Sequence, residues 1–171
     1  MSAKVPTGPS TPSLFSEASE SVTRARAPLP REWITANVDG GARGNPGPAG
    51  YGVYIRSGNG VPIAQLSEYL GHRTNNFAEY SALLAALEYA VAHGHRALKV
   101  VSDSELMVRQ MTGQYRVNSP DLKPLYEKAR GLVRQLDKFS IEHVLRANNK
   151  HADQLANEAM DRGMGKSKGK I

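Results

Sequence analysis

The alternation of apolar and polar residues predicts three β-strands at the start of the regular part of the chain. Period-two alternation indicates strands at residues 33–39, 51–57 and 61–70. A Gly- and Pro-rich segment at residues 40–50 separates the first two strands, and we expect it to form a turn. The Ser-Gly-Asn-Gly sequence at residues 57–60 is typical of a β-hairpin, so the second and third strands are expected to be neighbours.

Helical spacing of apolar residues follows the three strands. Tyr80, Leu84, Leu87 and Val91 fall on one face of a helix predicted over residues 75–93. The remaining pattern predicts a strand, two helices, a strand and a last helix, at residues 97–102, 103–111, 120–136, 139–145 and 149–162. This order of elements predicts an α/β fold, a five-stranded mixed sheet with helices on both faces.

The two ends of the chain differ in composition from this regular part. Residues 1–31 hold five of the ten prolines and many Ser and Thr residues, which predicts a disordered N-terminal tail. Residues 164–171 contain three lysines among small residues and predict a basic, flexible C-terminal tail. The formal net charge of +6 is concentrated in these tails, leaving about +1 for the expected catalytic domain, residues 32–163. A polyanionic partner and a merely solubilising role of the tails both account for this charge.

The composition excludes several kinds of site and location. The chain has no cysteine, so disulfides and thiolate metal sites are excluded, and any metal site uses oxygen or histidine ligands. The most apolar stretch, residues 81–92, is short and contains Glu88, so no membrane span is expected. The N-terminus lacks the order of a secretory signal. We therefore expect a cytoplasmic protein with no membrane partner, acting as a monomer.

Four acidic residues occupy positions that the predicted fold can bring together. Asp39 and Asp103 end the first and fourth strands, while Glu79 and Asp153 lie in the first turns of the predicted helices. Ligands of open α/β sheets bind beyond the strand ends, near a switch in strand order. Four convergent carboxylates repel one another unless cations neutralise them. Two Mg²⁺ ions would balance the charge, and paired metals of this kind suit phosphodiester cleavage.

Most of these acids also have a simpler structural explanation when each is taken alone. Asp103 could cap the helix that follows it, and Glu79 and Asp153 could complement helix dipoles. Asp39 has no such explanation, because it stands at a strand end immediately before two glycines. The set as a whole therefore favours a metal site.

Four segments of the chain resemble the ordered motifs of the ribonuclease HI (type 1 ribonuclease H) family. Asp39 opens a Gly-rich segment at residues 39–52 that resembles the first motif, and residues 74–79 (Thr-Asn-Asn-Phe-Ala-Glu) resemble the second. Residues 102–104 (Ser-Asp-Ser) and 149–156 (Asn-Lys-His-Ala-Asp-Gln-Leu-Ala) resemble the third and fourth. The likeness extends over about residues 33 to 162. Four ordered motifs at domain-scale spacing are a specific signal, whereas the Gly-rich loop alone would be weak.

The resemblance implies a ribonuclease H-like fold and a metal-dependent endonuclease. Members of the family hydrolyse the RNA strand of RNA–DNA hybrids with Mg²⁺ or Mn²⁺ and leave 5′-phosphate and 3′-hydroxyl ends. Asp39, Glu79, Asp103 and Asp153 match the catalytic, metal-binding acids of the family.

The resemblance also implies residues that contact the substrate. Arg43, Asn45 and Asn75 match positions that lie against the RNA strand, and Thr74 matches a residue that binds a phosphate of the DNA strand. Arg146, at the predicted strand end, could hold a phosphate or be an ordinary surface arginine. The loop that carries Arg43 and Asn45 could be a simple connection, and Asn75 could be a helix cap.

Two departures from the better-known members concern the substrate. Many relatives carry a basic, aromatic-rich insertion after the third motif that grips the DNA strand, but here residues 112–119 are short and keep only Arg116 as a basic residue. Weak intrinsic affinity for the hybrid is therefore expected. His151 is a possible auxiliary to catalysis, in place of a loop histidine of the relatives, or a solvated helix residue. The other histidines are expected to be surface residues: His72, His93, His95 and His143.

Two other functions compete with a hybrid-cutting nuclease. The missing insertion keeps open a related nuclease that acts on double-stranded or structured RNA. A catalytically idle nucleic-acid-binding module on the same fold is the third hypothesis, and the complete set of acids argues against it because such a cluster is costly without metal.

Overall fold

The five predicted strands form one mixed sheet in the computed structural model, which describes residues 32–165. The predictions for residues 1–31 and for the lysines after Gly165 lie outside these residues. The strands are β1 (Trp33–Ala42), β2 (Gly47–Arg56), β3 (Pro62–Arg73), β4 (Ala97–Ser102) and β5 (Lys138–His143). Their order across the sheet is β3-β2-β1-β4-β5. The first three pair antiparallel, whereas β1 with β4 and β4 with β5 pair parallel, so the predicted mixed sheet is confirmed.

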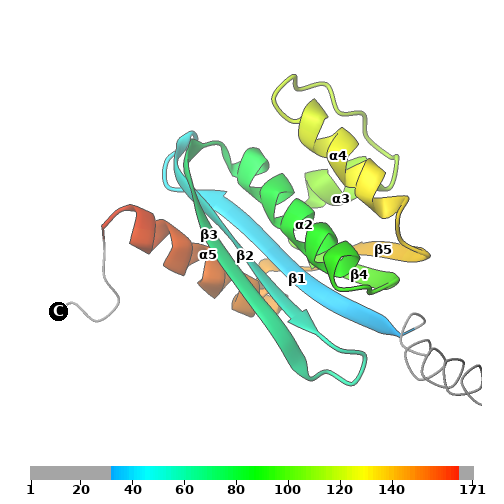
Figure 1. Cartoon of the computed structure of the whole chain (residues 1–171). Coiled ribbons are helices and arrows are strands. Elements are labelled where there is room, and N and C mark those ends of the chain that lie inside the picture. The colour runs from blue at the N-terminus through cyan, green and yellow to red at the C-terminus, as the bar shows by residue number, and fades with distance from the viewer. Residues whose placement is uncertain (1–31, 166–171) are drawn as a thin grey trace, which may run out of the picture. The chain divides into compact units, whose positions relative to one another are not determined.

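Helices cover both faces of the sheet, as predicted. The helices are α2 (Asn75–Ala92), α3 (Glu105–Met111), α4 (Lys123–Val133) and α5 (Lys150–Gly163), with a 3₁₀ turn η2 (Arg146–Asn148) before the last. Figure 1 shows α2, α3 and α4 on one side of the sheet and α5 on the other. The buried apolar residues of β1, Ile34, Ala36 and Val38, face the α2 layer and join its core. Within residues 32–165, none of the helices combines the length and apolar character that a membrane span requires.

Several predicted boundaries were wrong. The expected turn at residues 40–50 is mostly strand, because β1 and β2 continue to pair up to Ala42 and Ala49, and only residues 43–46 form the connection. Helix α4 begins at Lys123 and not at residue 120, with a proline in its first turn, and it ends at Val133. Gly and Pro density signals a turn locally, but the long-range pairing of two strands overrides it here.

Two glycines let the helices of both layers approach the sheet closely. A Cβ built on Gly40 would lie 2.2 Å from the carbonyl carbon of Ala78 in α2. A Cβ on Gly52 would lie 2.4 Å from the carbonyl oxygen of Ala152 in α5. Real Cβ atoms do not approach this closely, so any side chain at either position would push a helix away. The glycines thus set the depth at which α2 and α5 carry their acidic residues.

Candidate active site

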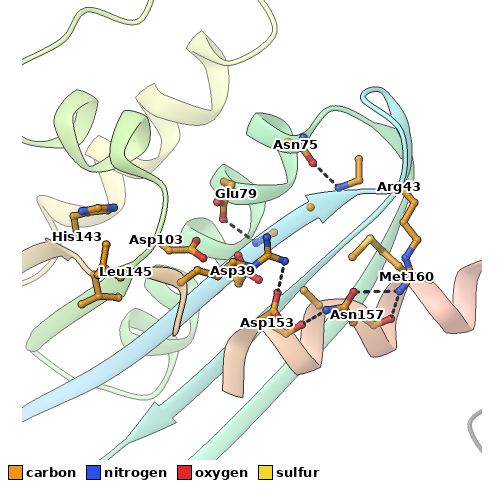
Figure 2. Close-up of a pocket in the computed structure, with 16 residues that line it drawn as sticks. Asp39, Arg43, Asn75, Glu79, Asp103, His143, Leu145, Asp153, Asn157 and Met160 are labelled. Atoms are coloured by element: carbon orange, nitrogen blue, oxygen red, sulfur yellow. Dashed lines mark hydrogen bonds and ion pairs between the residues drawn. The ribbon is translucent and has the colours of Figure 1, made fainter. Parts of the chain in front are cut away.

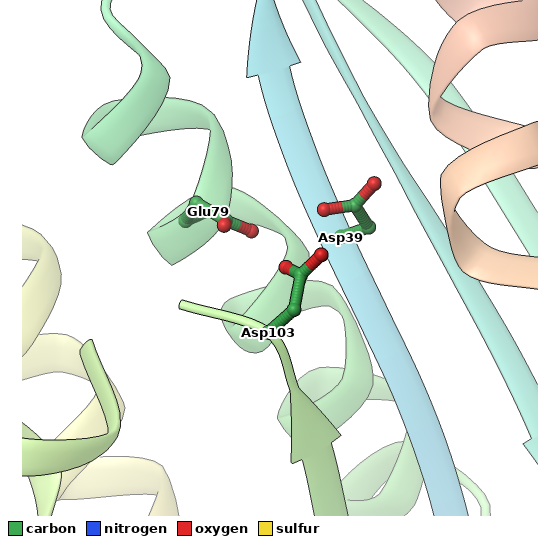
Figure 3. Close-up of side chains that lie close together, drawn as sticks. All are labelled: Asp39, Glu79 and Asp103. Atoms are coloured by element: carbon green, nitrogen blue, oxygen red, sulfur yellow. The ribbon is translucent and has the colours of Figure 1, made fainter. Parts of the chain in front are cut away.

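Three carboxylates meet at one edge of the sheet. Val38 of β1 pairs with Ser102 of β4 in the parallel ladder, so the residues that follow them, Asp39 and Asp103, emerge side by side. Glu79 reaches the same point from α2, and its Oε1 accepts a hydrogen bond of 2.8 Å from the backbone amide of Gly40. Carboxylate oxygens of these three acids lie within 4.8 Å of one another, and Figure 3 shows the carboxylates turned toward a common point. The parallel strand ends and α2 therefore build a group of acids suited to a metal ion.

Asp153 lies beside this group and comes from the opposite helical layer. All four predicted acids line one open cavity of about 710 Å³, which we call the carboxylate cavity. Asp153 lies in the first turn of α5, as predicted, and contacts Asp39 through its side chain. Its Oδ1 accepts a hydrogen bond of 3.3 Å from Nη2 of Arg146. Figure 2 shows Asp153 across the cavity from Glu79, with Asp39 between them.

The positions of the acids correct three expectations from the sequence. Glu79 is not in the first turn of α2, since the helix begins at Asn75 and has no acidic residue in its first turn. Asp103 is not a helix cap, because the side chain of Ser104 caps α3 by accepting from the amide of Met107. Asp39 lies inside β1, three residues before its end at Ala42. Capping therefore does not account for Asp103, and a first-turn dipole effect does not account for Glu79.

The electrostatics of the cluster favour bound cations. Burial raises the pKa of the Asp39 carboxyl to about 9, and the nearby Glu79 and Asp103 push it further in the same direction. Burial, followed by the charge of Asp103, raises the pKa of Glu79 to about 8, although the Gly40 amide and the Arg146 guanidinium oppose the shift. These carboxyls are hard to ionise together in the absence of a counter-charge. A divalent cation would supply that charge, and carboxylate oxygens are the ligands that Mg²⁺ and Mn²⁺ prefer.

Three of the five predicted substrate residues line the carboxylate cavity. Arg43, Asn75 and Arg146 are among its lining residues. Arg43 forms an ion pair with Asp161, and its Nη2 donates to the side chain of Asn157, so α5 fixes its position. The Asn75 side-chain oxygen accepts a hydrogen bond of 2.7 Å from the Ala42 amide. The guanidinium-bearing side chain of Arg146 is 77% exposed and remains accessible from solvent.

The other two, Asn45 and Thr74, support the rim of the cavity. The Asn45 side-chain oxygen accepts from the Asn75 amide at 3.0 Å and ties the β1–β2 connection to α2. Thr74 is the N-cap of α2 and accepts from the Phe77 amide at 3.1 Å, so the alternative that Asn75 caps this helix is wrong. Asn45 and Thr74 are both exposed. Their contacts with nucleic acid stay predictions.

Several residues of the cavity did not stand out in the sequence. His143, Leu145, Asn157 and Met160 line it, and Figure 2 shows them around the acids. A signal for Asn157 was present, because it lies four residues after Asp153 and so shares its helix face. His143 is exposed, as predicted, and its pairing with Ser102 at the parallel strand ends places it at the cavity.

His151 points away from the carboxylate cavity. Its ring stacks on Tyr54 with a centroid distance of 4.0 Å, and it lines a separate hollow. His151 precedes Asp153 by two residues, which places the two side chains on different sides of α5. The geometry therefore favours the other prediction for His151, a solvated helix residue, over an auxiliary role in catalysis.

Known proteins resemble this chain in sequence and in fold. The model of the reverse transcriptase-like family matches residues 37–159. The chain is 46% identical to ribonuclease HI of Halobacterium salinarum over 128 residues, 75% of this chain and 64% of that protein. The solved structure of LC11-RNase H1 in complex with an RNA/DNA hybrid matches with a TM-score of 0.73 at 42% identity, covering 77% of this chain and 99% of that chain.

The chain belongs to the ribonuclease HI family. A second relative, a bifunctional protein of Mycobacterium tuberculosis, is 44% identical over 129 residues, 75% of this chain and 35% of that protein. The match to this ribonuclease HI family member thus covers 64% and 35% of the lengths of the two curated relatives.

This ribonuclease HI family member is a short form, as the sequence predicted. Helix α3 ends at Met111 and α4 begins at Lys123, so no additional helix or protrusion stands between them in the described chain. The connection is anchored on α3, where Tyr115 packs its ring under the guanidinium of Arg109 at 5.3 Å. The aromatic residue of this segment therefore packs on the protein's own helix.

Proposed function

We propose that the chain is an endonuclease that hydrolyses the RNA strand of RNA–DNA hybrids with two divalent ions, Mg²⁺ or Mn²⁺. The observation that carries the proposal is the approach of Asp39, Glu79 and Asp103 to within 4.8 Å of one another. Asp153 extends the same cavity. The donor set is made of carboxylate oxygens alone, which fits hard divalent cations and gives two ions four negative charges to neutralise.

The acids of the cavity would hold the ions, and the remaining residues would place the strand. When bound, the ions supply a water of lowered pKa and stabilise the charge that develops on the leaving oxygen. Arg146 donates one hydrogen bond to Asp153 and keeps further N–H donors for a phosphate oxygen of the substrate. Asn75 and Arg43 are held rigidly by Ala42 and Asp161, so they present a preformed wall to the RNA strand.

The proposed reaction is the hydrolysis of one phosphodiester bond. The oxygen of water forms a bond to phosphorus, the bond from phosphorus to the 3′ oxygen breaks, and that oxygen takes up a proton. The water's own proton passes to solvent. The phosphate then stays on the 5′ end of one product, and the other product ends in a 3′-hydroxyl.

The choice of substrate is supported by similarity and by the shape of the short form. The related LC11-RNase H1 was solved with an RNA/DNA hybrid, which supports a hybrid as the substrate here. A protein that distinguishes RNA from DNA does so by contacts to the 2′-hydroxyl. The short connection between α3 and α4 leaves fewer contacts to a second strand, so double-stranded RNA is the alternative substrate to test.

Cleavage of matched substrates tests the proposal. End-labelled hybrid, double-stranded RNA, single-stranded RNA and double-stranded DNA of one sequence are incubated with Mg²⁺, Mn²⁺ or chelator. We expect cleavage of the RNA strand of the hybrid, no cleavage in chelator, and 5′-phosphate ends on the products. Asp103→Asn is the inactive control. Undiminished cleavage by that variant or in chelator would overturn the metal mechanism, and a preference for double-stranded RNA would overturn the hybrid substrate.

A further inference from the structure

A second hollow lies under the start of α5, separate from the carboxylate cavity. It has a volume of about 260 Å³ and lies between β1, β2 and the segment that leads into α5. We call it the Arg56 hollow, and it is lined by Asn37, Tyr54, Arg56, Ala147, Asn148, Asn149, Lys150 and His151. It shares no lining residue with the carboxylate cavity, so the proposed nuclease chemistry does not use it.

The lining of the Arg56 hollow is basic. Arg56 and Lys150 each bring a positive charge, His151 brings a further nitrogen, and none of the described residues that line it is acidic. Helix α5 starts here without a side-chain cap, so the positive end of its dipole adds to this charge. The local potential therefore attracts an anion.

The guanidinium of Arg56 is only partly paired. Within residues 32–165, its Nε is the only buried side-chain nitrogen or oxygen without a hydrogen-bond partner. Its Nη2 donates to the side-chain oxygen of Asn37 at 3.0 Å. An arginine has five N–H donors, and a buried donor that stays unpaired is destabilising. An anion in the hollow would provide the missing acceptors after a small movement of the side chain.

Two asparagine side chains of the hollow, Asn37 and Asn149, are already engaged with their neighbours. The Asn149 side chain is buried, donates to the Val38 carbonyl at 2.8 Å and accepts from the Asn37 amide group at 3.0 Å. The remaining Asn37 oxygen accepts from Arg56. Stacking on Tyr54 fixes the ring of His151. The charged groups that the hollow offers to a ligand, on Arg56 and Lys150, are donors, which fits an anion.

From these contacts we infer that the Arg56 hollow is a phosphate-binding site. Phosphate presents several acceptor oxygens at once and pairs well with arginine and lysine. The hollow lies near the carboxylate cavity. Asn37 of the hollow precedes Asp39 of the cavity by two residues on β1, and two strand residues span about 7 Å. The bound group is either a backbone phosphate of a nucleic acid or a free phosphate. In both cases it would hold the first turn of α5, which carries Asp153.

Titration with inorganic phosphate tests the site without metal or activity. Amide chemical shifts of Lys150 and His151 are followed by NMR in chelator, at constant ionic strength, for the wild type, Lys150→Ala, Arg56→Gln and Lys128→Ala. Lys128 is an exposed lysine on α4, so its variant removes the same charge elsewhere. We expect saturable shifts in the wild type and Lys128→Ala, and binding about tenfold weaker in the other two variants. If Arg56→Gln does not fold, Lys150→Ala alone decides. Shifts that do not saturate, or equal binding by Lys150→Ala and Lys128→Ala, would overturn the inference.

A competition experiment identifies the source of the phosphate. Uncleaved hybrid is added to phosphate-saturated Asp103→Asn protein, and the same amides are observed. Displacement of inorganic phosphate by the hybrid assigns the site to a backbone phosphate, and simultaneous binding assigns it to a free phosphate. Because the phosphate titration needs no hydrolysis, its outcome is independent of the proposed nuclease activity.

Discussion

Gly40 and Glu79 are joined by a hydrogen bond of 2.8 Å from the backbone amide of the glycine to Oε1 of the glutamate. The same glycine has no room for a side chain, since a Cβ would lie 2.2 Å from the carbonyl carbon of Ala78. One residue therefore sets both the distance between α2 and β1 and the orientation of the second carboxylate. Asp39 precedes this glycine directly, so any displacement of α2 separates two acids of the cluster.

We predict that Gly40→Ala lowers both stability and activity. The new methyl group forces α2 away from β1, and overpacking of this kind costs about 1–3 kcal/mol. Displacing Glu79 should also weaken metal binding. Urea unfolding and the metal concentration at half-maximal activity measure the two effects. Gly131→Ala is the matched control, because Gly131 lies within α4 with only the end of the Arg134 side chain at 4.0 Å. Alanine there should stabilise the helix by roughly 0.5–1 kcal/mol. Equal behaviour of the two variants would show that the close approach at Gly40 does not matter.

Removal of one carboxylate of the cluster should separate activity from stability. We predict that Asp39→Asn or Asp103→Asn lowers kcat by about 10³-fold or more, because a metal ion contributes several kcal/mol to the transition state. Without metal, both variants should unfold at the same or a higher urea concentration than the wild type, since charge repulsion is relieved. Asp137→Asn is the control, because it removes an exposed acid outside the cluster. Asp137 forms an ion pair with Arg96. A clear loss of metal-free stability in Asp39→Asn would instead give the acid a structural role.

The raised pKa values predict an unusual dependence of stability on pH. Asp39 titrates at its ordinary 3.8 when unfolded and at about 9 when folded, and Glu79 moves from 4.5 to about 8. Between these values the folded protein binds more protons than the unfolded chain, so its free energy of unfolding falls as pH rises. Each carboxyl contributes at most about 1.4 kcal/mol per pH unit.

Urea unfolding of the metal-free protein at about pH 5 and about pH 8 measures this slope. Asp39→Asn should flatten the slope, because one of the two shifted groups is gone. Saturating Mg²⁺ should also oppose the loss at high pH, since the ion binds the ionised folded form. A metal-free protein that becomes more stable from the lower to the higher pH would contradict the prediction.

Arg146 should act on the substrate through its exposed guanidinium. We predict that Arg146→Ala lowers kcat/KM by about tenfold, as expected for one lost charge-assisted hydrogen bond, while Arg146→Lys retains part of the activity. Unfolding free energy should change little, because the ion pair with Asp153 is solvent-exposed on the arginine side. Arg96→Ala removes an exposed, paired arginine elsewhere and serves as control. Equal kcat/KM for the two alanine variants would make Arg146 an ordinary surface residue.

The order of strands and helices and the four acidic positions were predictable from the sequence. Apolar periodicity is a local property. The strand at residues 97–102 was therefore predicted with its observed bounds, and the helix that begins at Asn75 was predicted to end one residue beyond its observed end. The acids were recognisable because the segments around them resemble ordered motifs, although Asp39 lies inside its strand and Glu79 lies beyond the first turn of its helix. The extent of β1 and β2 was not predictable, because residues 40–42 and 47–50 carry turn-forming residues and become strand only by pairing with each other.

The tertiary structure alone decided which side chains meet. Arg43 is paired with Asp161, more than a hundred residues away in sequence, and Gly40 holds Glu79, so neither contact leaves a local pattern. The sequence likewise placed His151 near Asp153, but the fold turns it toward Tyr54 and into a second, basic hollow. Local patterns arise from the backbone geometry of neighbouring residues, whereas a site arises from packing between elements whose depth and angle depend on every contact across the core.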